Sequence, residues 1–160
     1  MPDLLVKLYE LPTGTLLLER LQAEGIEIRR AIAPEKSMIV RWVDEQFSNR
    51  WACECEIAFT RQPIGCILAT QAETLCGFTC YGIICPDFLG PIGVAAQWRK
   101  QDVGSALLLA GLEALRAQGY AYGIIGGAGP VRFFEKTVGA KVIENSEPGI
   151  YRGLLKNCAQ

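Results

Sequence analysis

The sequence predicts a mixed α+β domain, in which a mostly antiparallel sheet holds one parallel strand pair and is flanked by helices. Three observations support this class. Short apolar runs between 55 and 94 are joined by brief turns, which is typical of an antiparallel meander. A long apolar stretch at 102–118 has helical spacing. That helix joins strands expected at 88–94 and 120–125, and a strand–helix–strand crossover makes its two strands parallel.

Taken in order, the chain opens with a strand, a helix, a second strand and a second helix, expected at 4–11, 13–24, 26–32 and 34–47. Pro12 and Gly25 separate the first three, because proline stops a strand and glycine commonly ends a helix. Strands are then expected at 55–60, 64–70, 74–84 and 88–94. After the long helix and its following strand come a glycine-rich loop, a short helix and two strands, at 126–129, 130–137, 141–144 and 150–155.

All 160 residues are expected to form a single domain, with residues 1–25 as an N-terminal β–α extension. Half of the residues are hydrophobic, and a chain of this length buries roughly two-thirds of the surface that its unfolded form exposes. We expect the extension either to cover an edge of the sheet or to reach a second copy of the chain in a homodimer.

Charge and hydropathy exclude several classes of protein. The 16 basic and 17 acidic residues give a net charge of −1, which provides no overall attraction for nucleic acid. No apolar run reaches the roughly 18 residues that a membrane span needs, and no export signal is visible at the N-terminus. Seven cysteines without a framework spacing favour reduced thiols. We therefore expect a cytoplasmic protein that binds neither nucleic acid nor membrane.

The sequence contains no histidine, which excludes Ser–His and Cys–His catalysis and removes the commonest metal ligand. Cys53 and Cys55 resemble half of a metal site, and Cys76 and Cys80 the other half, but neither pair has a usual zinc spacing. Buried cysteines commonly behave as small hydrophobic residues. We therefore predict no metal site and interpret these cysteines as core residues.

The stretch 94–108 carries the strongest functional signal. An apolar strand runs into a polar turn that holds Arg99 and Lys100, and the turn opens directly into the long helix. Amides at a helix N-terminus lack partners within the helix, and the helix dipole is positive there, so an anion is stabilised. Gly104 and Ser105 are small enough to let a ligand approach the backbone. The stretch therefore predicts a phosphate or pyrophosphate site.

These residues resemble a signature of the Gcn5-related N-acetyltransferase (GNAT) superfamily: Arg or Gln, two residues, Gly, one residue, then Gly or Ala, after a strand that ends in Val. Val94 matches the strand end, and Arg99-Lys-Gln-Asp-Val-Gly104 matches the signature. Gln101-Asp-Val-Gly-Ser-Ala106 fits in a second register, but the distance from Val94 to Gly104 is the usual one in the family. Phe133-Phe-Glu-Lys-Thr-Val-Gly139 is similar to a second family signature. The resemblance to the superfamily covers roughly residues 26–155. The stretches 90–94 and 124–130 also look like those of a bacterial subgroup of this superfamily.

The resemblance implies a GNAT-like sheet whose parallel strands splay apart, with acetyl-CoA as co-substrate in the gap. It implies that backbone groups of Ile92 and Val94 bind the pantetheine arm, and that the Val94 amide polarises the thioester carbonyl as an oxyanion contact. The pyrophosphate would then lie on the turn that follows. The implied cofactor-binding residues are Ile92, Val94, Arg99, Lys100, Gln101, Asp102, Val103, Gly104, Ser105, Phe133 and Phe134.

Two residues depart from the family pattern. Asp102 stands in place of the first signature glycine, and its carboxylate either faces the pyrophosphate, which is repulsive, or caps the helix on the amide of Gly104 or Ser105. Phe134 stands where many members have the tyrosine that protonates the departing thiolate. Either the thiolate leaves unassisted, since a thiol pKa is about 8.5, or another hydroxyl donates; the candidates are Tyr120, Tyr122 and Tyr151.

The family often uses a carboxylate on a central strand as the base that deprotonates the amine. The candidates here are Glu54, Glu56, Glu73 and Asp87. Glu54 and Glu56 flank Cys55 on one expected strand and so share a face, where repulsion between like charges raises one pKa. The alternative is that both face solvent. We take Glu54 and Glu56 as the catalytic candidates, with the Val94 amide.

The implied activity is transfer of the acetyl group from acetyl-CoA to a primary amine of a small molecule or a peptide. The amine would attack directly in a ternary complex, with no covalent enzyme intermediate. One alternative is a non-catalytic acyl-CoA-binding or sensor module on the same fold. Another is a structural or partner-binding domain whose motif has decayed.

Overall fold

The computed structural model describes residues 1–156 and contains one seven-stranded sheet. Its strands are β1 (Leu4–Lys7), β2 (Ile26–Arg30), β3 (Cys66–Gln71), β4 (Thr74–Tyr81), β5 (Phe88–Val94), β6 (Tyr122–Ile125) and β7 (Lys141–Val142). They lie in the order β2-β3-β4-β5-β6-β1-β7. Neighbouring strands are antiparallel except for β5 and β6, which are parallel. The predicted fold class is therefore confirmed.

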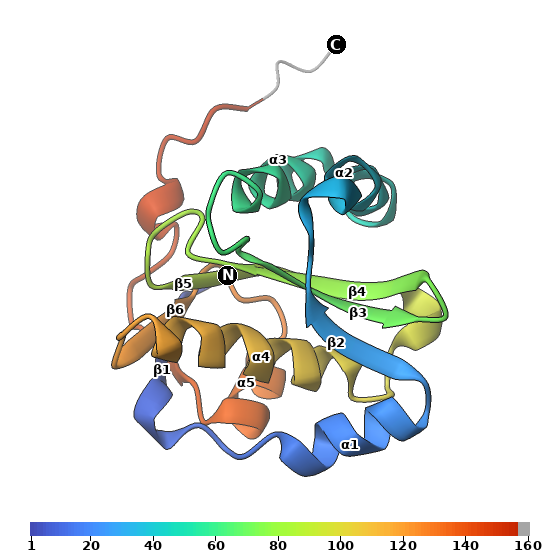
Figure 1. The fold of residues 1–160 in the computed structure, drawn as a ribbon. Coiled ribbons are helices and arrows are strands. Elements are labelled where there is room, and N and C mark those ends of the chain that lie inside the picture. Colours follow the sequence, from blue (N-terminus) through green and yellow to red (C-terminus); the bar gives the residue numbers. More distant parts are fainter. Residues whose placement is uncertain (157–160) are drawn as a thin grey trace.

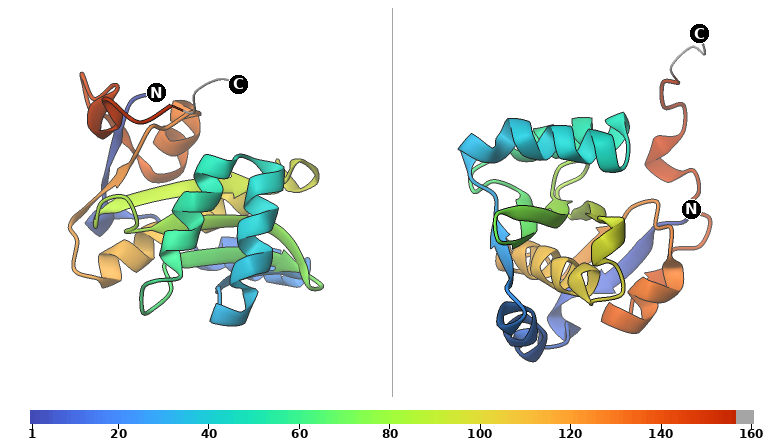
Figure 2. Two further views of the ribbon diagram at one scale, coloured as in Figure 1. Left: turned by 90° about the horizontal axis from the view of Figure 1, so that it is seen from above. Right: turned by 90° about the vertical axis from the view of Figure 1, so that its right-hand side faces the viewer.

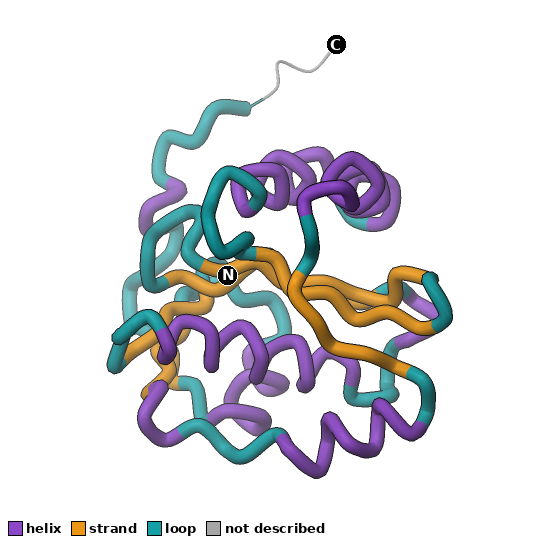
Figure 3. Tube along the Cα trace, in the orientation of Figure 1, coloured by secondary structure: helices purple, strands orange, loops and turns teal. Residues whose placement is uncertain are grey.

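Helices cover both faces of this sheet (Figures 1 and 3). One face carries α2 (Lys36–Gln46) and α3 (Asn49–Ala58), which pack side by side and are seen from above in Figure 2. The other face carries α1 (Thr15–Ala23), α4 (Val103–Ala117) and α5 (Val131–Val138). Of the helices in residues 1–156, none has the length and apolar character that crossing a bilayer requires.

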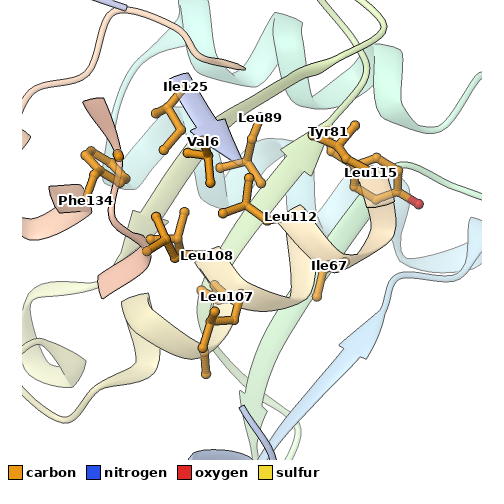
Figure 4. Packing of buried hydrophobic residues seen from close by; sticks show 14 of the residues in the cluster. Val6, Ile67, Tyr81, Leu89, Leu107, Leu108, Leu112, Leu115, Ile125 and Phe134 are labelled. Carbon is orange, nitrogen blue, oxygen red and sulfur yellow. The ribbon is translucent and has the colours of Figure 1, made fainter. Parts of the chain in front are cut away.

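Each face of the sheet has its own hydrophobic core. The larger core lies against α4, and Leu107, Leu108 and Leu112 of this helix belong to it together with Leu89 of β5 and Phe134 of α5 (Figure 4). The smaller core lies under α2 and α3 and is built from aliphatic, small and aromatic residues, including Ile39, Val43, Ala52 and Phe78. Burying one large apolar side chain contributes about 1.5–3 kcal/mol, so both layers hold the sheet firmly.

Strand β5 parts from its parallel neighbour after a short contact. The last pair in the described chain is Leu89 opposite Ile125, where β6 ends, so β5 continues to Val94 without a partner on this side. On its other side β5 stays paired with β4, although a β-bulge shifts the register between Thr79 and Tyr81. A bulge bends a strand and increases its twist. The early end of β6 leaves a gap beside the second half of β5, and the bulge bends β5 along it.

The strand expected at 55–60 is wrong, because this stretch belongs to helix α3. Ser48 begins the helix, and its Oγ accepts a hydrogen bond from the Trp51 amide at 3.2 Å. The buried residues recur at every third position, as Ala52, Cys55 and Ala58. That spacing is helical, whereas the alternation of cysteine and glutamate at 53–56 imitates a strand.

The strand expected at 150–155 is also wrong, since a 3-10 turn occupies Gly149–Tyr151 and irregular backbone follows it. The first strand ends at Lys7 rather than at 11, and a 3-10 turn continues it over Leu8–Glu10. Residues 1–25 hold an inner strand, because β1 pairs with β6 on one side and β7 on the other. The last four residues of the expected domain lie outside the described residues.

Candidate functional site

A cleft of about 1170 Å³ opens where β5 and β6 part. One end is formed by the turn before α4 and by the first turn of that helix. The other end is formed by α3 and by a C-terminal segment, with Arg50, Trp51, Glu54, Glu147, Pro148 and Tyr151. The backbone of β5 from Gly90 to Val94 runs between them. The cleft therefore connects the predicted phosphate turn with a carboxylate and a phenol.

Two backbone amides of β5 face this cleft. The Ala95 amide donates to the Cys76 carbonyl at 2.9 Å, so residue 95 is directed at β4. Hydrogen bonds alternate along an antiparallel pair, so Gly93 also faces β4, while Ile92 and Val94 direct their amides to the opposite side. On that side β6 has already ended at Ile125. The Val94 amide, which we predicted as the contact to the oxyanion, therefore points into the gap beside β5.

The turn between β5 and α4 collects positive charge. Lys100 and Asp102 adopt left-handed backbone conformations, with φ of 61° and 63°, which turn the chain sharply into the helix at Val103. Arg99 and Lys100 line the cleft, and Gly104 and Ser105 of the first helical turn line it beside them. First-turn amides have no partner within the helix. Together with the helix dipole, these groups favour an anion at this end.

Asp102 lines the cleft as well, but Arg20 of α1 holds its carboxylate. The Arg20 Nη2 donates to the Asp102 Oδ2 at 2.6 Å. The alternative in which Asp102 caps the helix on the Gly104 or Ser105 amide is therefore wrong, because in the described chain the carboxylate bonds to Arg20 instead. Arg20 offsets the negative charge next to the anion site. The sequence reasoning missed Arg20, which is 82 positions away from its partner.

Three predicted residues lie away from the cleft. The Gln101 side chain donates to the Gln97 carbonyl at 3.1 Å, and Val103 is buried in the larger core. Glu56 is exposed and pairs with Lys36 at 3.0 Å. The expectation that Glu54 and Glu56 share a face is wrong, because residues two apart on a helix point about 200° away from each other.

Glu54 lies at the α3 end of the cleft with only 19% of its side chain exposed. Burial raises the pKa of this carboxyl, and the nearby Arg50 partly opposes the rise. The Arg50 Nε lies 3.7 Å from the Glu54 Oε1. A carboxylate with a raised pKa is a stronger proton acceptor. Glu54 thus has the environment that a general base requires.

Tyr151 stands beside Glu54 in the same end of the cleft. The guanidinium carbon of Arg50 lies 5.0 Å from the Tyr151 ring centroid, so Arg50 contacts both residues. Burial and the Glu54 charge raise the pKa of Tyr151, with Arg50 acting in the opposite direction. Its hydroxyl therefore stays protonated at neutral pH. Of the three tyrosines considered from the sequence, the structure brings this one to the cleft.

Phe133 and Phe134 pack edge to face, with ring centroids 5.1 Å apart, and both line the cleft. Phe134 is 3% exposed and belongs to the larger core. The Phe133 ring comes within 3.6 Å of the position that a Cβ on Gly104 would occupy. The pair thus forms an apolar wall next to the start of α4.

The cysteines group differently from the two pairs that the sequence suggested. Cys53 is exposed, and Cys76 is buried in the larger core. Cys55, Cys66 and Cys80 are buried together, with their three sulfur atoms within 4.8 Å of one another. This cluster lies in the smaller core, apart from the residues that line the cleft.

The sheet order and the flanking helices match a known fold: this chain has the fold of the GCN5-related N-acetyltransferases. A GCN5-related glucosamine N-acetyltransferase region of a fungal multi-domain β-N-acetylglucosaminidase superposes with a TM-score of 0.73 at 13% identity, over 89% of this chain and 19% of that one. A GCN5-related N-acetyltransferase from Sphaerobacter thermophilus gives 0.65 at 18% identity, over 89% and 48%.

A third structure with this fold is a GNAT family acetyltransferase from Brucella melitensis in complex with acetyl-CoA. It gives a TM-score of 0.52 at 19% identity, over 74% of this chain and 86% of that one. The chain spans less than half the length of the fungal and Sphaerobacter proteins. Comparison of the sequence with family models and with curated proteins finds no match.

Proposed function

We propose that this protein is a GNAT-type N-acetyltransferase that moves the acetyl group of acetyl-CoA to a primary amine of a small molecule or a peptide. One observation carries the proposal. A single cleft joins the basic turn at the start of α4 to the partly buried carboxylate of Glu54, past the outward-facing amides of β5. Acetyl-CoA bound in the Brucella melitensis protein, which has the same fold, supports the choice of occupant.

In this proposal the cofactor lies along the length of the cleft. Arg99, Lys100 and the first-turn amides at Gly104 and Ser105 hold the pyrophosphate. The pantetheine arm follows the β5 edge, where Ile92 and Val94 present backbone groups in place of a strand partner. The thioester then lies near Val94, which leaves the α3 end of the cleft for the amine.

The reaction follows from that placement. The amine nitrogen attacks the thioester carbonyl carbon, so an N–C bond forms and the carbonyl oxygen takes up negative charge. The Val94 amide donates to this oxyanion. Glu54 accepts the proton that the nitrogen loses. The C–S bond then breaks, and the CoA thiolate takes a proton from Tyr151 or, as a fair leaving group, from solvent. No group on the protein becomes acetylated.

Ligand binding and turnover test the proposal separately. Millimolar acetyl-CoA or CoA should raise the melting temperature of the native protein, because a ligand that binds the folded state stabilises it. The double substitution Arg99→Glu with Gly104→Glu should abolish that rise. Arg41→Glu on α2, an exposed charge reversal away from the cleft, is the matched control and should preserve it. A native protein whose melting temperature ignores both ligands would refute the proposal.

A non-catalytic acyl-CoA sensor is the second candidate function, and Phe134 favours it. Phe134 occupies the position of the usual acid, yet it is buried and cannot donate a proton. Release of free thiol in the presence of a broad panel of primary amines decides between the two functions. Turnover that exceeds hydrolysis of acetyl-CoA supports the transferase, whereas tight CoA binding without turnover supports the sensor.

A further inference from the structure

Three cysteines from three different elements converge in the smaller core. Cys55 lies on α3, Cys66 begins β3 and Cys80 lies near the end of β4. Each is 0% exposed, and their sulfur atoms all lie within 4.8 Å of one another. The acetyl-transfer proposal uses none of them, and they stand apart from the cleft lining.

The sheet register explains why two of the sulfurs meet. Cys66 and Cys80 are direct partners across β3 and β4. The Tyr81 amide donates to the Gly65 carbonyl at 3.0 Å, so the adjacent pair is the hydrogen-bonded one. Cys66 and Cys80 are therefore a non-hydrogen-bonded pair, in which side chains on one face come closest. Cys55 faces them from the buried side of α3.

This spacing is close to what one three-coordinate ion needs. Sulfur binds such an ion at about 2.3 Å, so three sulfurs around it stand about 4.0 Å apart if the arrangement is planar and closer together if it is pyramidal. The three sulfurs already lie within 4.8 Å of one another. Each would move by less than about 1 Å, well within the adjustment of a side chain. Three thiolates with no oxygen or imidazole partner select soft ions.

The net charge of the ion with its three thiolates then limits which ion fits the site. All three cysteines are 0% exposed, and the residues packed around them in the smaller core are hydrophobic. A negative complex in apolar surroundings is costly, so a neutral complex fits best.

We propose that Cys55, Cys66 and Cys80 form a binding site for a soft, three-coordinate metalloid or metal ion, and that trivalent arsenic fits it best. Arsenous acid, As(OH)₃, reacts with three thiols to give As(SR)₃ and three waters. Three As–S bonds replace three As–O bonds, the thiol protons leave in the waters, and no oxidation state changes. The product is neutral, whereas a divalent ion such as cadmium leaves one negative charge in the core and releases three protons.

Arsenite titration of the fully reduced, full-length protein tests the site. We expect one arsenic per chain after gel filtration, little dependence on pH, and weaker binding of cadmium. Cys55→Ala, Cys66→Ala and Cys80→Ala should each weaken arsenite binding by more than the roughly 10- to 100-fold that loss of an outer partner costs a metal site. Cys53→Ala is the matched control on the same helix, is exposed, and should bind as the native protein does.

X-ray absorption on the native protein keeps the test decisive if an alanine variant fails to fold. Three sulfur neighbours around arsenic support the site, while two sulfurs or any oxygen neighbour overturn it. Full binding in a folded Cys66→Ala variant, or loss of binding in Cys53→Ala, also overturns it. Because none of these measurements involves acetyl-CoA, the outcome is independent of the proposed transferase activity.

Discussion

At the scale of single residues, Glu54 and Glu56 lie only two positions apart but have opposite surroundings. Glu54 is largely buried at the cleft, whereas Glu56 is exposed and paired with Lys36. In the proposed reaction Glu54 is the base, and replacing a base removes a contribution to the rate of typically 10²- to 10⁴-fold. Glu54→Gln should therefore lower kcat by about 10²-fold or more and leave CoA affinity unchanged. Steady-state kinetics with the best amine acceptor measures this.

Glu56→Gln is the control for that substitution, since it makes the same chemical change on the same helix. Its kcat should stay within about twofold of the native value, because exposed ion pairs contribute little. Equal losses of rate in both variants would mean that α3 as a whole, and not the Glu54 carboxylate, affects catalysis.

The raised pKa of Glu54 also predicts how stability and rate depend on pH. Burial favours its neutral form in the folded protein, so ionised Glu54 destabilises the fold at neutral pH. Glu54→Gln should thus melt at a higher temperature than the native protein at pH 7. As the pH falls below the raised pKa this difference should shrink, and it should vanish at the ordinary glutamate pKa, where the unfolded chain is protonated too. The rate of the proposed reaction should fall around the raised pKa itself, because protonated Glu54 cannot accept a proton.

Arg20 predicts a long-range effect on cofactor binding. It bonds to the Asp102 carboxylate at 2.6 Å, next to the proposed pyrophosphate position. Arg20→Ala leaves that carboxylate without its cation and should weaken CoA binding, by less than about tenfold because both groups are partly exposed. Asp102→Asn in the Arg20→Ala background should restore affinity. Calorimetric titration of CoA would contradict the explanation if the double variant bound no better than Arg20→Ala alone.

At the scale of elements, the start of α3 decides where Glu54 points. Ser48 Oγ accepts from the Trp51 amide, and removing such a cap costs about 0.5–2 kcal/mol. Ser48→Ala should lower the free energy of unfolding by about 1 kcal/mol in urea denaturation. Ser37→Ala, at an exposed position inside α2, should change it by less than about 0.5 kcal/mol. Equal effects would mean that the cap does not stabilise α3.

Elements in which the hydrophobic residues repeat with a single clear period were predictable from the sequence. The apolar stripe of α4, the strand before it and the basic turn between them were expected close to where they lie. Helix α3 was not, because the alternation of cysteine and glutamate imitates a strand while the signal for a helix is one capping serine. Because this stretch was expected to be a strand, the sequence did not predict where the Glu54 side chain points.

At the scale of the whole molecule, the site depends on contacts between segments far apart in the chain. Tyr151 reaches the cleft from the C-terminal segment, and Arg20 reaches Asp102 from α1. The three clustered cysteines come from α3, β3 and β4. Local sequence patterns and short spacings do not indicate which distant segments come into contact. The sequence alone therefore predicts the basic turn before α4, while the place of Tyr151 in the cleft and the cysteine cluster require the fold.

The contribution of the first 25 residues to the stability of the fold can be tested directly. In a peripheral extension, substitutions would change the free energy of unfolding little, but β1 lies inside the sheet between β6 and β7. Leu4 on β1 is 0% exposed, whereas Leu16 on α1 is 81% exposed. Leu4→Ala should therefore cost about 2–5 kcal/mol of unfolding free energy, and Leu16→Ala less than about 0.5 kcal/mol. Urea denaturation of both variants measures the difference, and a Leu4→Ala protein as stable as Leu16→Ala would place β1 outside the cooperative core.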